Sequence, residues 1–404
     1  MALITVAAAE GIIMSHASGY GIEMLPFQLA KGRVLAADIL ADRSLPPYNR
    51  VTMDGIAIKY SSFIEGLRQF RICATMAAGN EPPAIVDPSD CVELMTGCAL
   101  PAATDTVIRY EDITINDGIA TINLESLKEG ANVHLAGADK LFGDVVVPTG
   151  AVIDAAVISM AASVGKHMLE VHKLPSVVVL STGNELVDVQ DEPGLYQVRR
   201  SNSYTIQAAL KQYGIEAVLL HVNDELLATR EILQKCLNEY DVIMLSGGVS
   251  MGKFDFVPQA LQESGVTQHF HKVMQRPGKP FWFGTHAASN TRIFAFPGNP
   301  VSAFLCLYRY FVPWLQQCMG IWKQQQPVAM LGADVSFQPA LQYFMQVSLA
   351  LNDLGVLVAM PVTGNGSGDF SNLLQSNAFM ELPADITNFR KGEVFAIWPF
   401  KQLF

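Results

Sequence analysis

The sequence has few charged residues and no excess of positive charge. Charged residues make up 16% of its 404 residues, and 38 acidic residues outnumber 27 basic ones, which gives a formal net charge of -11. This balance argues against general binding of nucleic acids, which requires a basic surface. An anionic ligand remains compatible with the sequence, provided that cations gather around it locally.

Cysteines at metal-binding or redox spacing are also absent. The six cysteines form no C-x-x-C pair, and no pair of histidines has the spacing of a metal site. We therefore predict buried, reduced thiols in a cytoplasmic protein. The cysteines are Cys73, Cys91, Cys98, Cys236, Cys306 and Cys318.

Signals for secretion or membrane insertion are missing as well. No basic segment followed by an apolar run stands at the start of the sequence, so we expect no signal peptide. The most apolar segment, 301–319, contains Arg309, Gln316 and Gln317. We expect it to form a buried amphipathic helix and not a membrane span.

The residues that are present predict several domains, because half of them are hydrophobic and the chain is too long for one core. Short β-type runs separated by Gly, Pro, Asn and Asp predict an antiparallel β domain from about residue 55 to 143. From Ser176, strands alternate with helices, which predicts a parallel-sheet α/β domain of roughly 150 residues. After Pro327 the sequence returns to β-type runs, which predict a C-terminal β domain. The expected fold class is multidomain, α/β plus β.

Three predicted strands of the α/β domain end in small polar residues. These ends are "STGNE" at 181–185, "SGGVS" at 246–250 and "PGNPVS" at 297–302. Ligands of open parallel sheets bind beyond the carboxyl ends of the strands, where all three segments would meet. One such loop could be no more than a tight turn, but three at one edge favour an anion cradle of outward N–H groups and hydroxyls. Its predicted residues are Ser246, Gly247, Gly248, Ser250, Asn299 and Ser302.

Charged residues stand beside this cradle. Glu185, Asp224 and Asp255 lie at or just after strand ends, and carboxylates next to a phosphate site commonly hold Mg²⁺. Asp224 also occupies a position that suits a helix N-cap. The segment "HKVMQRPGKP" places Lys272, Arg276 and Lys279 within eight residues, and Phe281 to Phe283 directly after it would anchor the loop. We expect these cations to face the anion.

Eight motifs make the chain resemble a known family. In order, they are "LPPYNRVTMDG", "ELMTGCALP", "GADKLFGD", "STGNELV", "RSNSYTI", "LSGGVSMGKFDF", "RPGKPFWFG" and "FPGNPVSAF". With this order and spacing, the whole chain resembles the molybdopterin molybdenumtransferase family, which includes the E domain of gephyrin. Related molybdopterin-adenylyltransferases share only the α/β domain.

The resemblance implies a domain organisation and an assembly. It implies an N-terminal helix (1–25) that packs on the α/β domain (176–325), a connecting domain in two parts (26–45 and 145–175), an inserted β domain (46–144) and a C-terminal β domain (326–404). It further implies a homodimer in which the inserted β domain of one subunit faces the α/β site of the other. A molybdopterin-adenylyltransferase is the implied upstream partner.

The reaction implied by the resemblance takes adenylylated molybdopterin and molybdate, uses Mg²⁺, releases AMP and leaves molybdenum on the dithiolene. A pyrophosphate needs a nest and a metal, and a tetrahedral dianion needs cations and hydroxyls. The functional positions carried over are Asp54, Thr96, Asp139, Glu185, Asp224, Asp255, Lys272, Arg276, Lys279, Pro297, Pro300 and Ser367.

The chain departs from the family pattern at several positions. His134, Leu135, Ala136 and Ala138 stand where the family carries charges, and Gln346 stands where an arginine is expected. One alternative is therefore a diverged molybdopterin-binding or scaffold paralogue without catalysis. Another is hydrolysis of a different nucleotide diphosphate by the same nest and metal.

Overall fold

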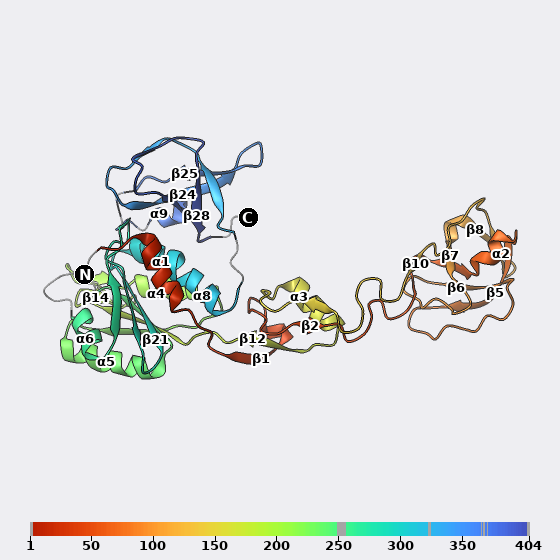
Figure 1. Ribbon diagram of the computed structural model, residues 1–404, viewed down its shortest axis with the longest axis horizontal. Coiled ribbons are helices and arrows are strands. Elements are labelled where there is room, and N and C mark those ends of the chain that lie inside the picture. Colours follow the sequence, from red (N-terminus) through yellow and green to blue (C-terminus); the bar gives the residue numbers. More distant parts are fainter. Residues whose placement is uncertain are drawn as a thin grey trace.

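The chain folds into an elongated molecule (Figure 1). An α/β unit and a C-terminal β unit lie together at one end, a narrow connection lies in the middle, and a second β unit lies at the other end. The computed structural model describes residues 3–248, 256–321, 325–364, 366, 368–369 and 371–401. Three predicted site residues, Ser250, Asp255 and Ser367, lie outside the described residues.

A six-stranded sheet forms the centre of the α/β unit, in the order β16-β13-β17-β21-β20-β18. The first four strands are parallel, as the alternation of strands and helices predicted. The last two form an antiparallel extension that the sequence analysis did not anticipate. The strands are β13 (Val177–Thr182), β16 (Val218–Val222), β17 (Val242–Ser246), β18 (Thr267–His271), β20 (Trp282–His286) and β21 (Thr291–Phe296).

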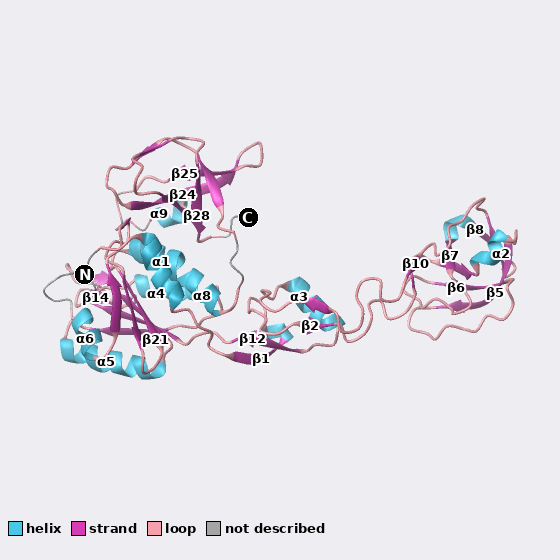
Figure 2. Ribbon diagram, viewed as in Figure 1, coloured by secondary structure: helices cyan, strands magenta, loops and turns pink. Residues whose placement is uncertain are grey.

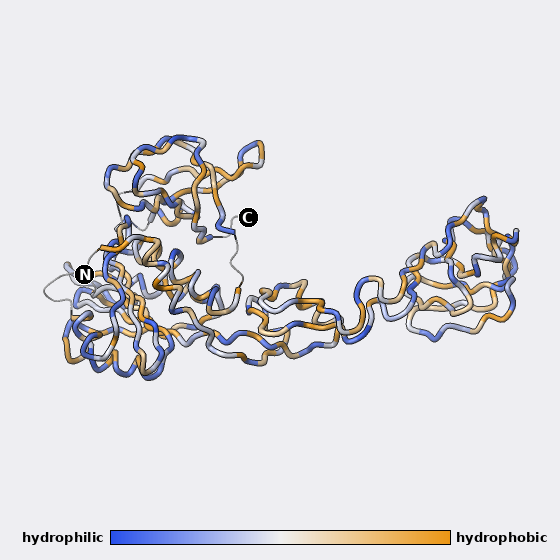
Figure 3. The backbone as a smooth tube through the Cα atoms, in the orientation of Figure 1, coloured by the Kyte–Doolittle hydropathy of each residue, from blue (hydrophilic) through white to orange (hydrophobic). Residues whose placement is uncertain are grey.

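Helices cover both faces of this sheet (Figure 2). One face packs with α1, α4, α7 and α8 in one hydrophobic core, and the other face packs with α5 and α6 in a second. Because both faces are covered, every residue of β13 is buried, whereas hydrophilic and hydrophobic residues alternate along the outer helices (Figure 3). The helices are α1 (Val6–Ser15), α4 (Asn202–Lys211), α5 (Leu226–Glu239), α6 (Val257–Glu263), α7 (Pro300–Cys306) and α8 (Val312–Cys318).

The segment 301–319 is buried, as predicted, but it is not one regular helix. A π-helical turn (Leu307–Phe311) separates α7 from α8, and the Val312 N–H donates to the carbonyl of Leu307. Pro313 explains the interruption, because its ring would collide with the carbonyl of Arg309 in a regular α-helix. Among the described residues, no helix is both long enough and apolar enough to cross a membrane.

The C-terminal unit is a small barrel, closed by a pairing of β24 with β26. A short strand from the α/β unit, β19 (Gln275–Arg276), joins its edge by parallel pairing with β24. The remaining elements are β22 (Val328–Leu331), β23 (Val335–Ser336), β24 (Gln342–Leu351), β25 (Leu357–Pro361), α9 (Asn372–Gln375), β26 (Ala378–Leu382), β27 (Asn388–Phe389) and β28 (Val394–Pro399).

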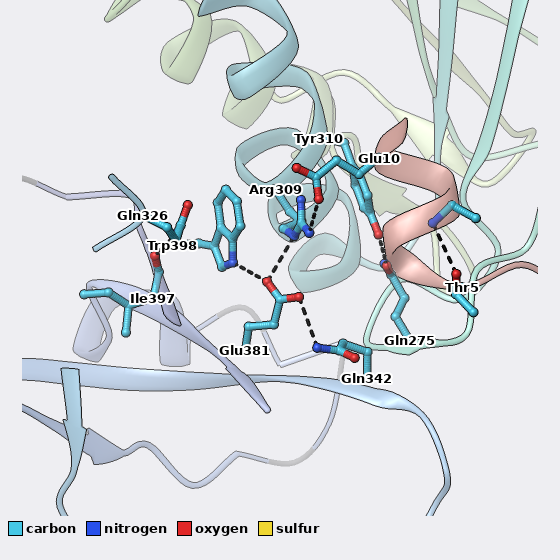
Figure 4. A network of polar contacts seen from close by, with 11 residues as sticks. Thr5, Glu10, Gln275, Arg309, Tyr310, Gln326, Gln342, Glu381, Ile397 and Trp398 are labelled. Atoms are coloured by element: carbon cyan, nitrogen blue, oxygen red, sulfur yellow. Dashed lines mark hydrogen bonds and ion pairs between the residues drawn. The ribbon is translucent and has the colours of Figure 1, made fainter. Parts of the chain in front are cut away.

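A buried arginine joins the barrel to the α/β unit (Figure 4). The side chain of Arg309 is 4% exposed, and its Nη2 lies 2.7 Å from Oε2 of Glu10 in α1. Its Nε lies 3.2 Å from Oε2 of Glu381 in β26. The same Glu381 accepts hydrogen bonds from Trp398 Nε1 at 2.6 Å and Gln342 Nε2 at 3.1 Å. One cation therefore connects the N-terminal helix, the α/β core and the barrel.

The middle of the molecule is built from pairs of strands whose members are far apart in the sequence. Helix α3 and a 3₁₀ turn, η1, pack beside two short antiparallel pairs, β1 with β12 and β2 with β11. The elements are β1 (Ile22–Pro26), η1 (Phe27–Leu29), β2 (Ile39–Leu40), β11 (Val145–Val147), α3 (Ala155–Ser163) and β12 (Met168–His172).

The distal β unit contains a six-stranded sheet in the order β7-β4-β6-β5-β9-β8. The predicted antiparallel arrangement holds for its other pairs, but β5 and β6 are parallel because the connection at 77–89 returns the chain to the same end. Its elements are β3 (Arg50–Val51), β4 (Gly55–Ile58), α2 (Tyr60–Ile64), β5 (Gln69–Met76), β6 (Asp90–Leu94), β7 (Thr106–Arg109), η2 (Tyr110–Asp112), β8 (Ile113–Asn116), β9 (Ile119–Ile122) and β10 (Val133–His134).

The cysteines are free thiols, and five of the six are buried. The prediction of a buried thiol is wrong for Cys73, which is exposed on β5. The register against β6 shifts between Ile72 and Ala74, so Cys73 is the extra residue of a bulge and is turned away from the core.

The Arg309 junction leads to a prediction about stability. Glu381→Ala should lower the free energy of unfolding by about 3–5 kcal/mol, because Arg309 would stay buried while losing one carboxylate. Asp385→Ala, which removes an exposed carboxylate of the same barrel, should change it by less than about 0.5 kcal/mol. Chemical denaturation of both variants checks this. An equal loss of unfolding free energy in the two variants would show that the pair of Arg309 and Glu381 contributes nothing specific to stability.

Candidate functional site

A cavity lies where the carboxyl ends of β13, β17 and β21 meet. Its volume is about 400 Å³. The parallel register sets Ser181 beside Ser246, and Ser246 beside Phe296, so the loops after the three strands start at one edge of the sheet. The lining residues include Ser181, Thr182, Glu185, Arg199, Arg200, Ser201, Asn202, Ser203, Ser246, Gly247, Gly298, Pro300 and Gly368.

Two glycines shape the turn after β17. Gly247 and Gly248 have φ angles of +89° and +68°, which residues with a side chain rarely adopt. A Cβ on Gly248 would come within 2.5 Å of Thr182 Oγ1 and 2.6 Å of Val257 Cγ2. The turn is therefore pressed against the end of β13, and a side chain at position 248 would disturb the fold as well as any ligand.

The start of α4 supplies further site residues, which belong to the motif "RSNSYTI". Asn202 Nδ2 donates to Ser246 Oγ at 3.1 Å and to the carbonyl of Gly298 at 2.8 Å, so it ties the start of α4 to the end of β17 and to the loop after β21. Ser203 and Thr182 are 1% and 3% exposed, and their hydroxyls are buried without a partner among the described residues. Both residues line the cavity, where a polar ligand would satisfy them.

Two adjacent arginines on the cavity wall were also missed. Arg200 forms an ion pair with Asp188 and lies over the ring of Tyr204, at 5.9 Å from its centroid. The hydroxyl of Tyr204, with the Val189 N–H and Arg200, lowers the pKa of Asp188, so this carboxylate stays charged. Arg199 and Arg200 therefore place positive charge beside the cradle. The signal was the pair of arginines directly before "SNSY".

The carboxylates predicted to bind Mg²⁺ lie on neighbouring loops. Glu185 lines the cavity, and the Asp224 N–H donates to Oδ1 of Asn184 at 3.1 Å, which draws the loops after β13 and β16 together. The N-cap of α5 is Glu225, so Asp224 does not occupy the cap position. Within the described ranges, no three His, Cys, Asp or Glu side chains gather as a metal site.

The remaining residues of the predicted cradle take different positions. Gly298 and Pro300 line the cavity, whereas Ser302 is buried in the first turn of α7 and is 3% exposed. Pro297 is buried and Asn299 is exposed as the N-cap of α7. Gly368 brings the C-terminal unit to the cavity wall.

The basic loop lies at the same edge of the sheet, but beyond the cavity. His271 at the end of β18 is opposite Trp282, which is opposite Ala295 near the end of β21, so Lys272 to Lys279 follow at the carboxyl edge. None of the three cations lines the cavity. Arg276 instead lies over the ring of Phe337 in the C-terminal unit, at 5.9 Å from its centroid.

Asp54 and Thr96 contact each other in the distal β unit. Oδ1 of Asp54 accepts hydrogen bonds from the N–H and hydroxyl of Thr96, at 2.6 and 2.7 Å. These two bonds lower the pKa of Asp54. Within one chain, this unit lies at the opposite end of the molecule from the cavity (Figure 1).

Asp139 belongs to a small cluster at the base of the same unit. An Nη of Arg50 lies 3.2 Å from Nδ1 of His134, and Nε2 of His134 lies 3.0 Å from Oδ1 of Asp139. Because arginine can only donate, Nδ1 of His134 accepts from Arg50, and the Nε2–H of His134 donates a hydrogen bond to Asp139. Arg50 thus places a cation beside His134, the residue that stands where the family carries a charge.

Protein families match successive parts of the chain. "MoeA N-terminal region (domain I and II)" matches residues 4–165, "Probable molybdopterin binding domain" matches 178–317, and "MoeA C-terminal region (domain IV)" matches 328–400. Together they cover the distal, α/β and C-terminal units.

Individual proteins resemble the chain along its full length. A molybdopterin molybdenumtransferase of Synechocystis is 37% identical over 399 residues, which cover 98% of this chain and 100% of that protein. One of Haemophilus influenzae is 30% identical over 387 residues, 94% of each chain. The crystal structure of the molybdopterin biosynthesis MoeA protein from Pyrococcus horikoshii has a TM-score of 0.85 at 25% identity, over 98% of this chain and 99% of that one. The chain therefore belongs to the molybdopterin molybdenumtransferase family.

Proposed function

We propose that the chain inserts molybdenum from molybdate into adenylylated molybdopterin and releases AMP. The cavity at the sheet edge is the observation that carries this proposal. It combines a glycine turn, a helix N-terminus, two arginines and two buried hydroxyls that have no partner among the described residues, which suits an anionic ligand with several polar groups. A binding paralogue could use the same cavity, and the release of AMP distinguishes it from the enzyme.

The two described carboxylates support a role for a divalent metal. Glu185 and Asp224 offer hard oxygen ligands on adjacent loops, and we propose that they hold Mg²⁺ together with Asp255. When bound, the ion would offset the charge of the phosphoanhydride during cleavage. The protein's own contribution is to hold the substrate: Asn202 ties α4 to the end of β17 and the loop after β21, and Thr182 and Ser203 offer hydroxyls to the substrate.

The basic loop suits molybdate better than the pterin. Lys272, Arg276 and Lys279 stand at the same sheet edge but outside the cavity, so a second, smaller anion could bind beside the first. The turn 276–279 packs on α7, since a Cβ on Gly278 would lie 3.7 Å from the carbonyl of Ser302, and α7 begins at the cavity with Pro300.

The distance between the two ends of the molecule supports a homodimer. Asp54, Thr96 and Asp139 can reach an α/β cavity only in another copy of the chain (Figure 1). We propose that the distal unit of one subunit faces the cavity of its partner. The upstream partner would be a molybdopterin-adenylyltransferase, and a cytoplasmic location agrees with six free thiols.

The test of this function is molybdate-dependent release of AMP from adenylylated molybdopterin by the purified chain. Gly298→Val should abolish release by filling the cavity, because a Cβ there meets nothing closer than Gly247 Cα at 3.9 Å. Gly19→Ala, at a glycine far from the sheet edge, should behave as the parent. Binding of the pterin without AMP release by the parent would instead identify a non-catalytic paralogue.

The proposed dimer predicts recovery of activity between two inactive variants. Asp54→Asn and Gly298→Val should each be inactive alone, whereas a co-expressed, doubly tagged heterodimer holds one intact site and should regain about half of the parent activity. Asp87→Asn, an exposed aspartate of the same distal unit, should stay active alone. A heterodimer without activity would contradict a site shared between subunits.

The basic loop leads to a prediction that distinguishes the response to molybdate from the affinity for the pterin. Lys279→Ala should raise the molybdate concentration for half-maximal AMP release by about tenfold and leave pterin affinity within about twofold, because it removes one cation from the oxyanion only. Lys235→Ala removes the same charge from the outer helix α5 and should change neither quantity. Loss of pterin binding with an unchanged molybdate response would assign the loop to the phosphates.

A further inference from the structure

A fully buried amide lies beneath the basic loop. Gln275 is 0% exposed and precedes Arg276 in β19. Its Oε1 accepts a hydrogen bond from the hydroxyl of Tyr310. Its Nε2 donates to the carbonyl of Gly278 at 3.2 Å and faces Cys306 Sγ at 3.7 Å. Both ends of the amide therefore have partners, which fixes its orientation.

The turn that carries the cations rests directly on this amide. Gly278 has a φ angle of +84°, and a Cβ there would lie 2.7 Å from Gln275 Nε2 and 3.0 Å from Cys306 Sγ. The carbonyl of Lys279 accepts a bond from the Val273 N–H at 2.9 Å. Arg276 and Lys279 thus project from a turn whose inner surface has no spare room.

The partner of the amide comes from the π-helical turn. Tyr310 is 1% exposed, and burial raises the pKa of its hydroxyl well above the usual value, so it remains a donor. The residue before it, Arg309, pairs with Glu381, and Glu381 accepts from Gln342, which lies opposite Gln275 in the β19–β24 pairing (Figure 4). The π-turn thereby holds the basic loop and the barrel at once.

We propose that Gln275 and Tyr310 are positioning residues that fix Arg276 and Lys279 for one tetrahedral oxyanion. This inference rests on the proposed function, in which the loop receives molybdate. The physical reason is that an oxyanion that loses water on binding requires cations in a set arrangement, and each cation here sits on a flexible, exposed side chain. A rigid turn beneath them reduces the ordering that binding would otherwise require.

The experiment measures molybdate binding to the intact chain by calorimetry, with pterin affinity and thermal unfolding measured in parallel. Tyr310→Phe removes one hydroxyl and leaves the ring, and it should weaken molybdate binding by about tenfold while pterin affinity changes less than about twofold. Tyr308→Phe is the matched control, because Tyr308 is a buried tyrosine of the same π-turn that lines a different cavity. It should bind molybdate as the parent does.

A second variant approaches the amide from the loop. Gly278→Ala should reproduce the selective loss, because its Cβ displaces Gln275 Nε2. Unchanged molybdate binding in folded Tyr310→Phe and Gly278→Ala would overturn the proposal, as would equal losses for both ligands or no molybdate binding by the parent. A parent that binds molybdate with this selective loss in the variants, but releases no AMP, would refute the proposed function and retain the positioning role.

Discussion

The arrangement of the molecule depends on one buried cation. Arg309 is 4% exposed, and its guanidinium lies 4.2 Å from the ring centroid of Trp398 while pairing with Glu10 and Glu381. A charge removed from water is tolerated only where such partners surround it, so α1, the π-turn and the barrel must meet in one geometry. The Arg309 junction also brings β19 to the barrel edge and Gly368 to the cavity wall. Stability and the shape of the site thus share one origin.

Charge is distributed in a way that suits an acidic protein with anionic ligands. The cradle itself consists mainly of backbone turns and hydroxyls, and its nearby cation Arg200 is partly offset by Asp188. The exposed cations of the basic loop lie farther along the same edge, at the antiparallel extension of the sheet. Two anions could therefore bind side by side without sharing every positive group, which limits their mutual repulsion.

Local patterns predicted the strand ends that form the cradle, because apolar runs followed by Ser, Gly and Asn mark both the strand and its exit. They did not predict β18 and β20, since the aromatic run Phe281 to Phe283 suits a loop anchor as well as a strand. The position of Arg200 on the cavity wall depends on Asp188 and Tyr204, and no local pattern in the sequence shows that these residues surround it. The bulge at Cys73 depends on β6, a partner that no local window contains. Long-range pairing accounts for each of these differences.

The narrow join to the distal unit has an evolutionary consequence. The chain enters that unit through Arg50 and Val51 and leaves it through Val133 and His134, which pair antiparallel with each other. Entry and exit are thus about 5 Å apart, the spacing of neighbouring strands. An insertion with such closely spaced ends can be gained, lost or exchanged between genes while the remaining fold keeps its connections. The fold of the other units therefore does not depend on the distal unit, which is joined to them by two neighbouring chain segments.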